Sequence, residues 1–170
     1  MIDTQKIIPM LWFDREAEQA ARYYVETFGD GEIVRIDRYG PGAPGPEGSV
    51  MLVTFRLFGQ TYQALNGGPL YKPTEALSLA VTCQDQAEVD RLWERLTADG
   101  GMPGPCGWLK DRWGFSWQIV PKHLFEMMRS PDSALRGRVF QAMMTMGRLD
   151  IATLEMAAAG VPACDSTPKG

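Results

Sequence analysis

Two stretches of this 170-residue chain repeat one pattern: "GFSWQIVP" at residues 114–121 and "GQTYQALN" at residues 59–66. Each has a glycine, a variable residue, a small hydroxyl residue, a large aromatic residue, a glutamine and two apolar residues. Short runs of this kind are typical of β-strands, which send alternate side chains to opposite faces of a sheet. Gln63 and Gln118 are the matching polar residues, so they are the first candidates for a functional role.

The same order of elements precedes each of these strands. In the first half, residues 6–13 predict a short apolar strand and Asp14 is expected to cap a helix. The stripe of that helix is Ala17, Ala21, Tyr24, Val25 and Phe28. Strands are expected at 32–39, 49–58 and 60–65, with the Pro/Gly-rich loop 40–48 between the first two. The first half therefore reads strand, helix and three strands.

The second half restarts this pattern. A strand at 77–83 leads to a helix that Gln84-Asp85 opens, and strands follow around 105–111 and 114–121. The stripe of this helix is Val89, Leu92, Trp93 and Leu96. An internal repeat is the most economical interpretation. We therefore predict an α+β fold: tandem βαβββ modules at 6–67 and 76–121 within a domain 1–125, forming a curved mixed sheet around a concave pocket.

Strand parity predicts which side chains line that pocket. If Trp117 and Ile119 pack beneath the helices, Ser116 and Gln118 must point to the other face. The same parity applies to the matching strands, and Cys106 is added from a neighbouring loop. The predicted pocket residues are Met10, Trp12, Thr61, Gln63, Ser78, Ala80, Cys106, Ser116 and Gln118.

The chain continues beyond the repeat. Residues 130–159 predict a helical extension, with helices starting near Pro131-Asp132 and Leu149-Asp150. These amphipathic helices could cover the domain's own sheet or clamp a second subunit. Residues 160–170 have the composition of a flexible tail, with Cys164 exposed.

Composition limits the partners. The net charge is −4, the pI is about 5.0, and no basic stripe is present, so nucleic acid is a poor candidate. No apolar run is long enough to span a membrane, and no secretory signal is visible. Three cysteines without paired spacing suit reduced thiols and a cytoplasmic location.

Several stretches resemble a known family. "FDREAEQAARYYVETFG", "CGWLKDRWGFSWQIVP" and "RVFQAMMTMGRLDIATLEMA" are similar to the PhnB-like branch of the vicinal oxygen chelate (glyoxalase/bleomycin-resistance/dioxygenase) superfamily. Members of this branch often carry the label 3-demethylubiquinone-9 3-methyltransferase. The resemblance extends over about residues 6–159 and implies the tandem fold predicted above.

The resemblance also bears on metal binding. Metal-using members take His, Gln or Glu ligands from four strands; here two of those positions correspond to Gln63 and Gln118. The opening-strand positions fall among residues 7–9 in one half and 77–78 in the other, and none of these residues is a usual ligand. Two neutral amides cannot replace imidazole, thiolate or carboxylate donors. We therefore expect neither a metal nor another cofactor.

The roles of the two glutamines, of two cysteines and of Asp111 each have two interpretations. The glutamines either line a hollow as satisfied polar groups or hydrogen-bond a ligand. Cys83 and Cys106 are either small core residues or nucleophiles. Asp111 is either a turn residue or an acid beside Lys110 at a pocket mouth.

The expected function is a metal-independent pocket for a small, partly apolar molecule, in a homodimer. The alternative is a metal-dependent lyase, isomerase or dioxygenase of glyoxalase type. The methyltransferase label has little support from the residues, because the loop 40–48 lies between strands and not between a strand and a helix.

Overall fold

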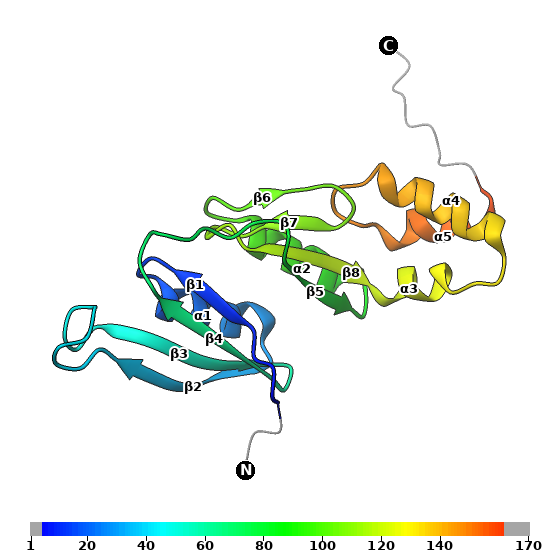
Figure 1. The fold of residues 1–170 in the computed structure, drawn as a ribbon. Helices are drawn as coiled ribbons and strands as arrows, with labels where there is room; N and C mark the ends of the chain where they lie inside the picture. Colours follow the sequence, from blue (N-terminus) through cyan, green and yellow to red (C-terminus); the bar gives the residue numbers. More distant parts are fainter. Residues whose placement is uncertain (1–4, 162–170) are drawn as a thin grey trace. The chain divides into compact units, whose positions relative to one another are not determined.

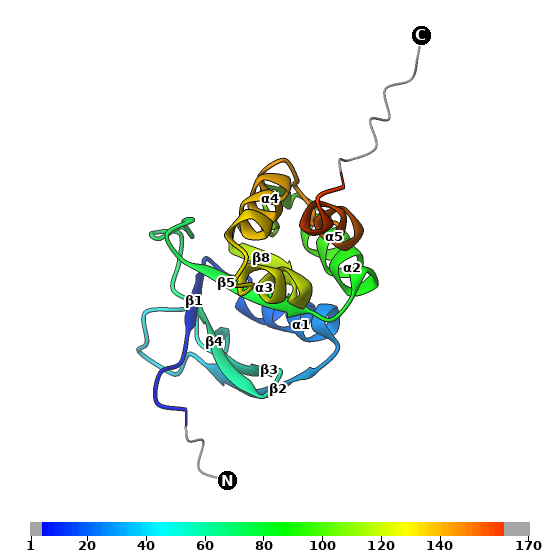
Figure 2. The same cartoon turned by 90° about the vertical axis from the view of Figure 1, so that its right-hand side faces the viewer.

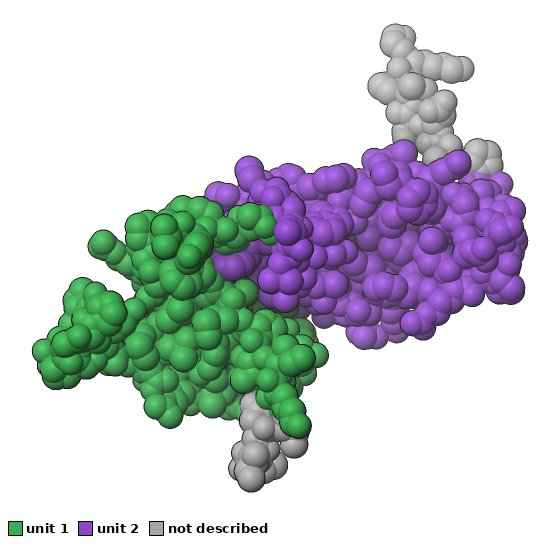
Figure 3. Space-filling view, viewed as in Figure 1, with its two compact units in different colours: residues 1–74 green, residues 75–170 purple. Residues whose placement is uncertain are grey.

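The computed structural model describes residues 5–161, and the chain folds into two compact units (Figures 1 and 3). The units comprise residues 1–74 and residues 75–170. Each contains one four-stranded sheet with a helix on one face. The expected α+β architecture of tandem βαβββ modules is confirmed, although the modules have separate sheets and do not share a continuous one.

The first unit has a mixed sheet whose strand order is β1-β4-β3-β2. Its elements are β1 (Met10–Phe13), α1 (Ala17–Phe28), β2 (Gly31–Arg38), β3 (Val50–Leu57) and β4 (Gln60–Asn66). Strand β1 runs parallel to β4, and the other neighbours are antiparallel. The core lies between α1 and one sheet face, where Tyr24 of α1 stacks on Phe55 of β3.

The start of α1 differs from the expectation. Asp14 does not cap the helix; the N-cap residue is Glu16, whose side chain makes no capping hydrogen bond. The Asn66 side chain, at the end of β4, accepts the hydrogen bond from the Ala17 N–H at 2.8 Å. Asn66 also donates to the Val50 carbonyl at 3.0 Å. One side chain therefore joins the helix to two strands, and it satisfies an N–H that the helix itself cannot pair.

The second unit repeats this topology with the strand order β5-β8-β7-β6. Its elements are β5 (Ser78–Cys83), α2 (Gln86–Thr97), β6 (Met102–Pro103), β7 (Trp108–Lys110) and β8 (Ser116–Pro121). Strand β5 runs parallel to β8, as β1 does to β4. Asp85 caps α2 as expected, because its carboxylate accepts from the Glu88 N–H at 2.9 Å.

Three helices follow β8: α3 (Lys122–Met128), α4 (Ser133–Met144) and α5 (Ile151–Ala159) (Figures 1 and 2). The sequence predicts α4 and α5, and the structure shows Asp132 and Asp150 as their N-caps. The short α3 was not predicted. A small core joins the three helices to the end of β8. Its buried members are Val120, Leu124, Val139, Leu149 and Leu154.

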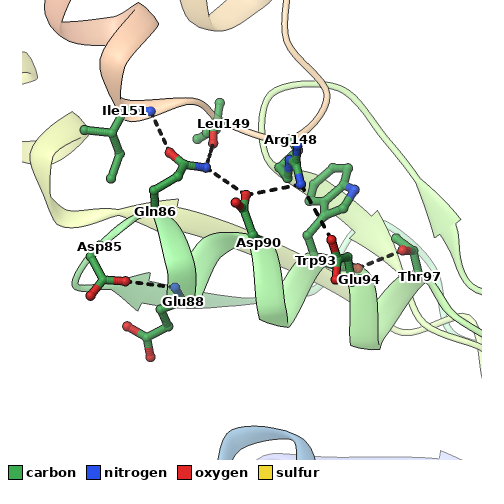
Figure 4. A network of polar contacts seen from close by, with 10 residues as sticks. All are labelled: Asp85, Gln86, Glu88, Asp90, Trp93, Glu94, Thr97, Arg148, Leu149 and Ile151. Atoms are coloured by element: carbon green, nitrogen blue, oxygen red, sulfur yellow. Dashed lines mark hydrogen bonds and ion pairs between the residues drawn. The ribbon is translucent and has the colours of Figure 1, made fainter.

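Polar contacts fix the extension to α2 of the same unit (Figure 4). Gln86 donates to the Leu149 carbonyl at 3.1 Å and accepts from the Ile151 N–H at 2.8 Å. Arg148 lies 3.2 Å from the Asp90 carboxylate. The extension thus covers its own unit, which was one of the two expected alternatives. The predicted tail lies mostly outside the described residues, and so does Cys164.

Candidate functional site

The two predicted glutamines lie on the sheet faces turned away from the helices. In β1, Leu11 and Phe13 are buried while Met10 is 51% exposed. Met10 is the register partner of Gln63 in β4, so both side chains share the face opposite α1. The parity predicted for this strand pair is therefore seen within the first unit.

Two other predicted residues of that face are covered by neighbouring chain. The Trp12 indole N–H donates to the Gly68 carbonyl at 2.8 Å, and its ring meets Tyr71 edge-on with 5.0 Å between centroids. Thr61 is buried, and its backbone exchanges hydrogen bonds with the Gln5 side chain. These contacts leave Met10 and Gln63 as the accessible pair of predicted residues in this unit.

In the second unit, β5 and β8 carry the matching residues. Ser78 pairs with Ser116 and Ala80 pairs with Gln118 in the parallel register, which places all four on one face. The Gln118 amide donates to the Ser78 hydroxyl at 2.8 Å. Gln118 is thus a partly satisfied polar group, which is one of the two interpretations considered above.

Gln63 has no corresponding bond. Its half-buried side chain makes no hydrogen bond to any residue that the structure describes. Ile8 takes the place in the first unit that Ser78 takes in the second, two residues before the partner of the glutamine. The repeat therefore conserves the glutamine but not its environment.

A groove of about 490 Å³ lies along the edge of the second sheet. Two predicted residues, Cys106 and Ser116, line it; Ser78, Ala80 and Gln118 lie on the sheet but are not among its lining residues. The lining is mainly apolar and consists of Glu75, Met102, Pro103, Gly104, Pro105, Cys106, Trp108, Leu109, Lys110 and Ser116. Such a composition suits a small, partly apolar molecule.

The polar groups of the groove are few. Ser116 is only 3% exposed, and its hydroxyl has no hydrogen-bond partner among residues 5–161. Lys110 is the register partner of Ser116 in the antiparallel pair β7–β8, and its ammonium group forms an ion pair with Glu75. The ion pair holds the pKa of Glu75 below its ordinary value, chiefly through the hydrogen bond from Lys110.

Cys106 stands in the wall of this groove in a left-handed backbone conformation, with φ 56°. Its N–H donates to the Met146 carbonyl at 2.7 Å, and its sulfur lies 3.5 Å from the Met144 sulfur. The next residue, Gly107, also has positive φ, and a Cβ there would lie 2.9 Å from the Ile119 carbonyl oxygen. The C-terminal extension therefore holds this wall in place.

The other described cysteine is a core residue. Cys83 is fully buried at the end of β5. Burial raises the pKa of its thiol to about 12. Because the thiolate is the reactive form, Cys83 is not suited to be a nucleophile at neutral pH.

Asp111 is not an acid at the pocket mouth. It is 2% exposed, and one carboxylate oxygen accepts from the N–H groups of Trp113 and Phe115 at 2.9 and 3.1 Å. The other accepts from the Trp117 indole at 2.9 Å. Asp111 therefore organises the β7–β8 turn, as the alternative interpretation held, and does so from inside the core.

The sequence did not point to the groove residues Glu75, Met102 and Trp108. Glu75 lies in a loop before β5, where no local pattern distinguishes it from other exposed acids. Met102 belongs to the two-residue strand β6, which is too short to show periodicity. Trp108 offered a signal, because strand alternation places it on the same face as Lys110 and opposite Leu109. That face is the predicted open face, since Trp108 is the register partner of Gln118.

Comparisons with known proteins agree with this architecture. A family model described as 3-demethylubiquinone-9 3-methyltransferase matches residues 5–120, so α3, α4 and α5 lie outside the match. None of the curated proteins matches the chain at a significant level.

Solved structures give further similarity. The chain is 36% identical to a PhnB protein from Bacillus cereus, with a TM-score of 0.62, over 69% of this chain and 99% of that one. It is 20% identical to protein PA1353 from Pseudomonas aeruginosa, with a TM-score of 0.54, over 69% of this chain and 98% of that one. Glyoxalase/bleomycin resistance proteins are also among the structural neighbours, such as one from Albidiferax ferrireducens T118, which is 18% identical with a TM-score of 0.43 over 66% of this chain and 95% of that one.

The family match and the identity to the Bacillus cereus protein agree with the repeated topology. The chain belongs to the PhnB-like family described as 3-demethylubiquinone-9 3-methyltransferase.

Proposed function

We propose that the groove of the second unit binds a small, partly apolar molecule without the help of a divalent metal. The observation that carries the proposal is the Ser116 hydroxyl, which is buried in a mainly apolar groove and has no hydrogen-bond partner among the residues that the structure describes. A buried hydroxyl without a hydrogen bond is costly, and a ligand that pairs with it removes that cost. The apolar walls would supply most of the binding free energy, and Ser116 would orient the ligand.

The donor chemistry of both sheets supports metal independence. Met10 and Ala80 occupy the positions beside the glutamines, and neither has a donor for a hard or borderline divalent ion. Gln118 offers only its neutral carbonyl oxygen, because an amide nitrogen is not a metal donor. Among residues 5–161 there is no group of three His, Cys, Asp or Glu side chains that could hold a metal ion. The residues present do not fit a metal site.

The family description suggests methyl transfer, and the local topology does not favour it. The Pro/Gly-rich loop 40–48 joins β2 to β3, which are antiparallel neighbours. A nucleotide-binding glycine turn instead connects a strand to a helix, whose N-terminus faces the phosphate or ribose. We therefore assign binding to this protein and do not assign methyl transfer.

We also propose that the protein is a homodimer located in the cytoplasm. Each sheet has a helix of its own unit on one face only, and Met10 on the other face of the first sheet is half exposed. Cys83 and Cys106 are not disulfide-bonded, which suits a reducing compartment. Within residues 5–161, no helix is long and apolar enough to cross a membrane. Light scattering at micromolar concentration tests the dimer, and a monomer there would contradict it.

Native mass spectrometry of freshly purified protein tests the main proposal. We expect a bound small molecule or an empty chain, and no stoichiometric Zn, Fe or Mn after dialysis. Ser116→Ala removes the unpartnered hydroxyl and should weaken retention of any apolar ligand, whereas Ser49→Ala, in the loop of the first unit, should not. About one tightly held metal ion per chain, or equal retention by both variants, would contradict the proposal.

A further inference from the structure

Lys110 and Ser116 form a pair of polar groups inside the apolar groove. They are direct register partners in the antiparallel strands β7 and β8, so their Cβ atoms lie close together on one face of the sheet. The Lys110 side chain is 28% exposed and the Ser116 hydroxyl is buried. A cation beside a hydrogen-bond donor is the arrangement that recognises a carboxylate.

Glu75 already presents a carboxylate at this position. It precedes β5 by three residues, and the first residue of β5, Ser78, is the register partner of Ser116. The Glu75 side chain is 64% exposed and pairs with Lys110 at the groove. It pairs with Lys110 but not with the Ser116 hydroxyl, which has no hydrogen-bond partner within residues 5–161.

We propose that the groove binds a small molecule with one carboxylate on an apolar body, and that Glu75 holds the place of that carboxylate until the ligand displaces it. This inference rests on the binding groove proposed above. It adds the chemical class of the ligand and a role for a residue of this chain as an internal competitor.

The balance of interactions favours exchange. An exposed ion pair such as Lys110–Glu75 contributes little, because solvent screens it and two flexible side chains must be held in one geometry. An incoming carboxylate can replace that ion pair and also accept a hydrogen bond from Ser116. Burial of its apolar body against Met102, Pro103 and Trp108 adds further favourable binding free energy, because apolar surface is removed from water.

Isothermal titration calorimetry with 4-phenylbutanoate and its neutral analogue 4-phenylbutanamide tests the inference on the full chain. Glu75→Gln keeps the shape but removes the competing charge, so it should tighten binding of the carboxylate by about two- to fivefold and leave the amide unchanged. Lys110→Met should lower the affinity for the carboxylate probe by about tenfold or more, and Lys110→Arg should retain part of that affinity.

A matched control is Glu32→Gln, which removes the acid of another exposed ion pair, with Arg56 in the first unit. It should change neither affinity. Circular dichroism and the denaturation midpoint of each variant verify that it is folded.

Two results would overturn the inference in different ways. The first result is that both probes bind, that Ser116→Ala lowers the affinity for both, and that Glu75→Gln and Lys110→Met change neither affinity. The groove is then a binding site, and the carboxylate preference is wrong. If neither probe binds the parent chain or Glu75→Gln at millimolar concentration, both the inference and the proposed groove function fail.

Discussion

The indole N–H of Trp117 donates a hydrogen bond to Asp111 across 2.9 Å in the buried interior of the second unit. Asp111 also accepts from two backbone N–H groups of the turn that leads to β8. One carboxylate therefore fixes both the turn and the aromatic residue of the repeated strand. The groove residue Ser116 lies between these two contacts in the chain and depends on them for its position.

Asp111→Ala should lower the free energy of unfolding by about 3 kcal/mol or more, because it removes the acceptor of three hydrogen bonds. Urea denaturation measures the change. Glu155→Ala, an exposed acid on α5, serves as the control and should stay within about 0.5 kcal/mol of the parent. An Asp111→Ala protein as stable as this control would contradict the role given to the carboxylate.

Trp117→Ala should cost about 3–5 kcal/mol through lost burial and a cavity. The indole is 2% exposed, so its removal leaves a void beneath α2 and also removes one of the donors to Asp111. Thermal and urea unfolding measure the loss. A change below about 1 kcal/mol would mean that the core closes over the void, which close-packed interiors do only in part.

The two glutamines should respond differently to leucine. Gln63→Leu should leave the free energy of unfolding within about 0.5 kcal/mol of the parent, since no hydrogen bond to a described residue is lost. Gln118→Leu removes the donor to Ser78 and should cost about 1 kcal/mol. Paired urea titrations distinguish the two variants, and equal losses would show that the Ser78 bond adds nothing.

Asn66→Ala should destabilise the first unit by about 1–2 kcal/mol, because the helix loses its side-chain cap and the Val50 carbonyl loses a donor. Asp14→Ala is the matched control, since the sequence suggested Asp14 as the cap. Denaturation of both variants decides between them. A larger loss for Asp14→Ala would contradict the capping role of Asn66.

Cys83 should make stability depend on alkaline pH. Its thiol pKa rises from about 9 in the unfolded chain to about 12 in the fold, so the folded state keeps the proton longer. The contribution of the protonated Cys83 thiol to the free energy of unfolding is fully present below pH 9. It is lost as the pH rises from 9 towards 12, and the free energy of unfolding falls by at most about 1.4 kcal/mol per pH unit.

Urea denaturation at pH 8, 9 and 10 compares the parent with Cys83→Ala, which lacks this proton. The difference in stability between the two proteins should narrow with rising pH, while other titrating groups cancel in the difference. A constant difference across this range would contradict the raised pKa.

Much of the fold could be predicted because its signals are local. The side chains of a strand alternate between its two faces, so Gln118 could be assigned to a face. Helix start signals are also local, so the starts of α2, α4 and α5 could be placed near Asp85, Asp132 and Asp150. The repeat of Gln63 and Gln118 likewise needs only comparison of the chain with itself. Of the residues predicted for the site, Cys106 and Ser116 line the groove, while Met10, Ala80 and Gln118 lie on the sheet faces opposite the helices. Their part in binding stays a prediction.

What the sequence by itself determined is thus the βαβββ repeat, the face on which each strand residue lies and the approximate starts of α2, α4 and α5. The tertiary structure alone decided that Asn66 caps a helix 49 residues earlier in the chain and that Asp111 is buried and accepts a hydrogen bond from Trp117. It also decided that Glu75 pairs with Lys110 at a groove where the Ser116 hydroxyl has no partner among the described residues. The reason is that propensity and periodicity act over a few residues, whereas these contacts join residues whose proximity exists only once the strands have paired and the helices have packed.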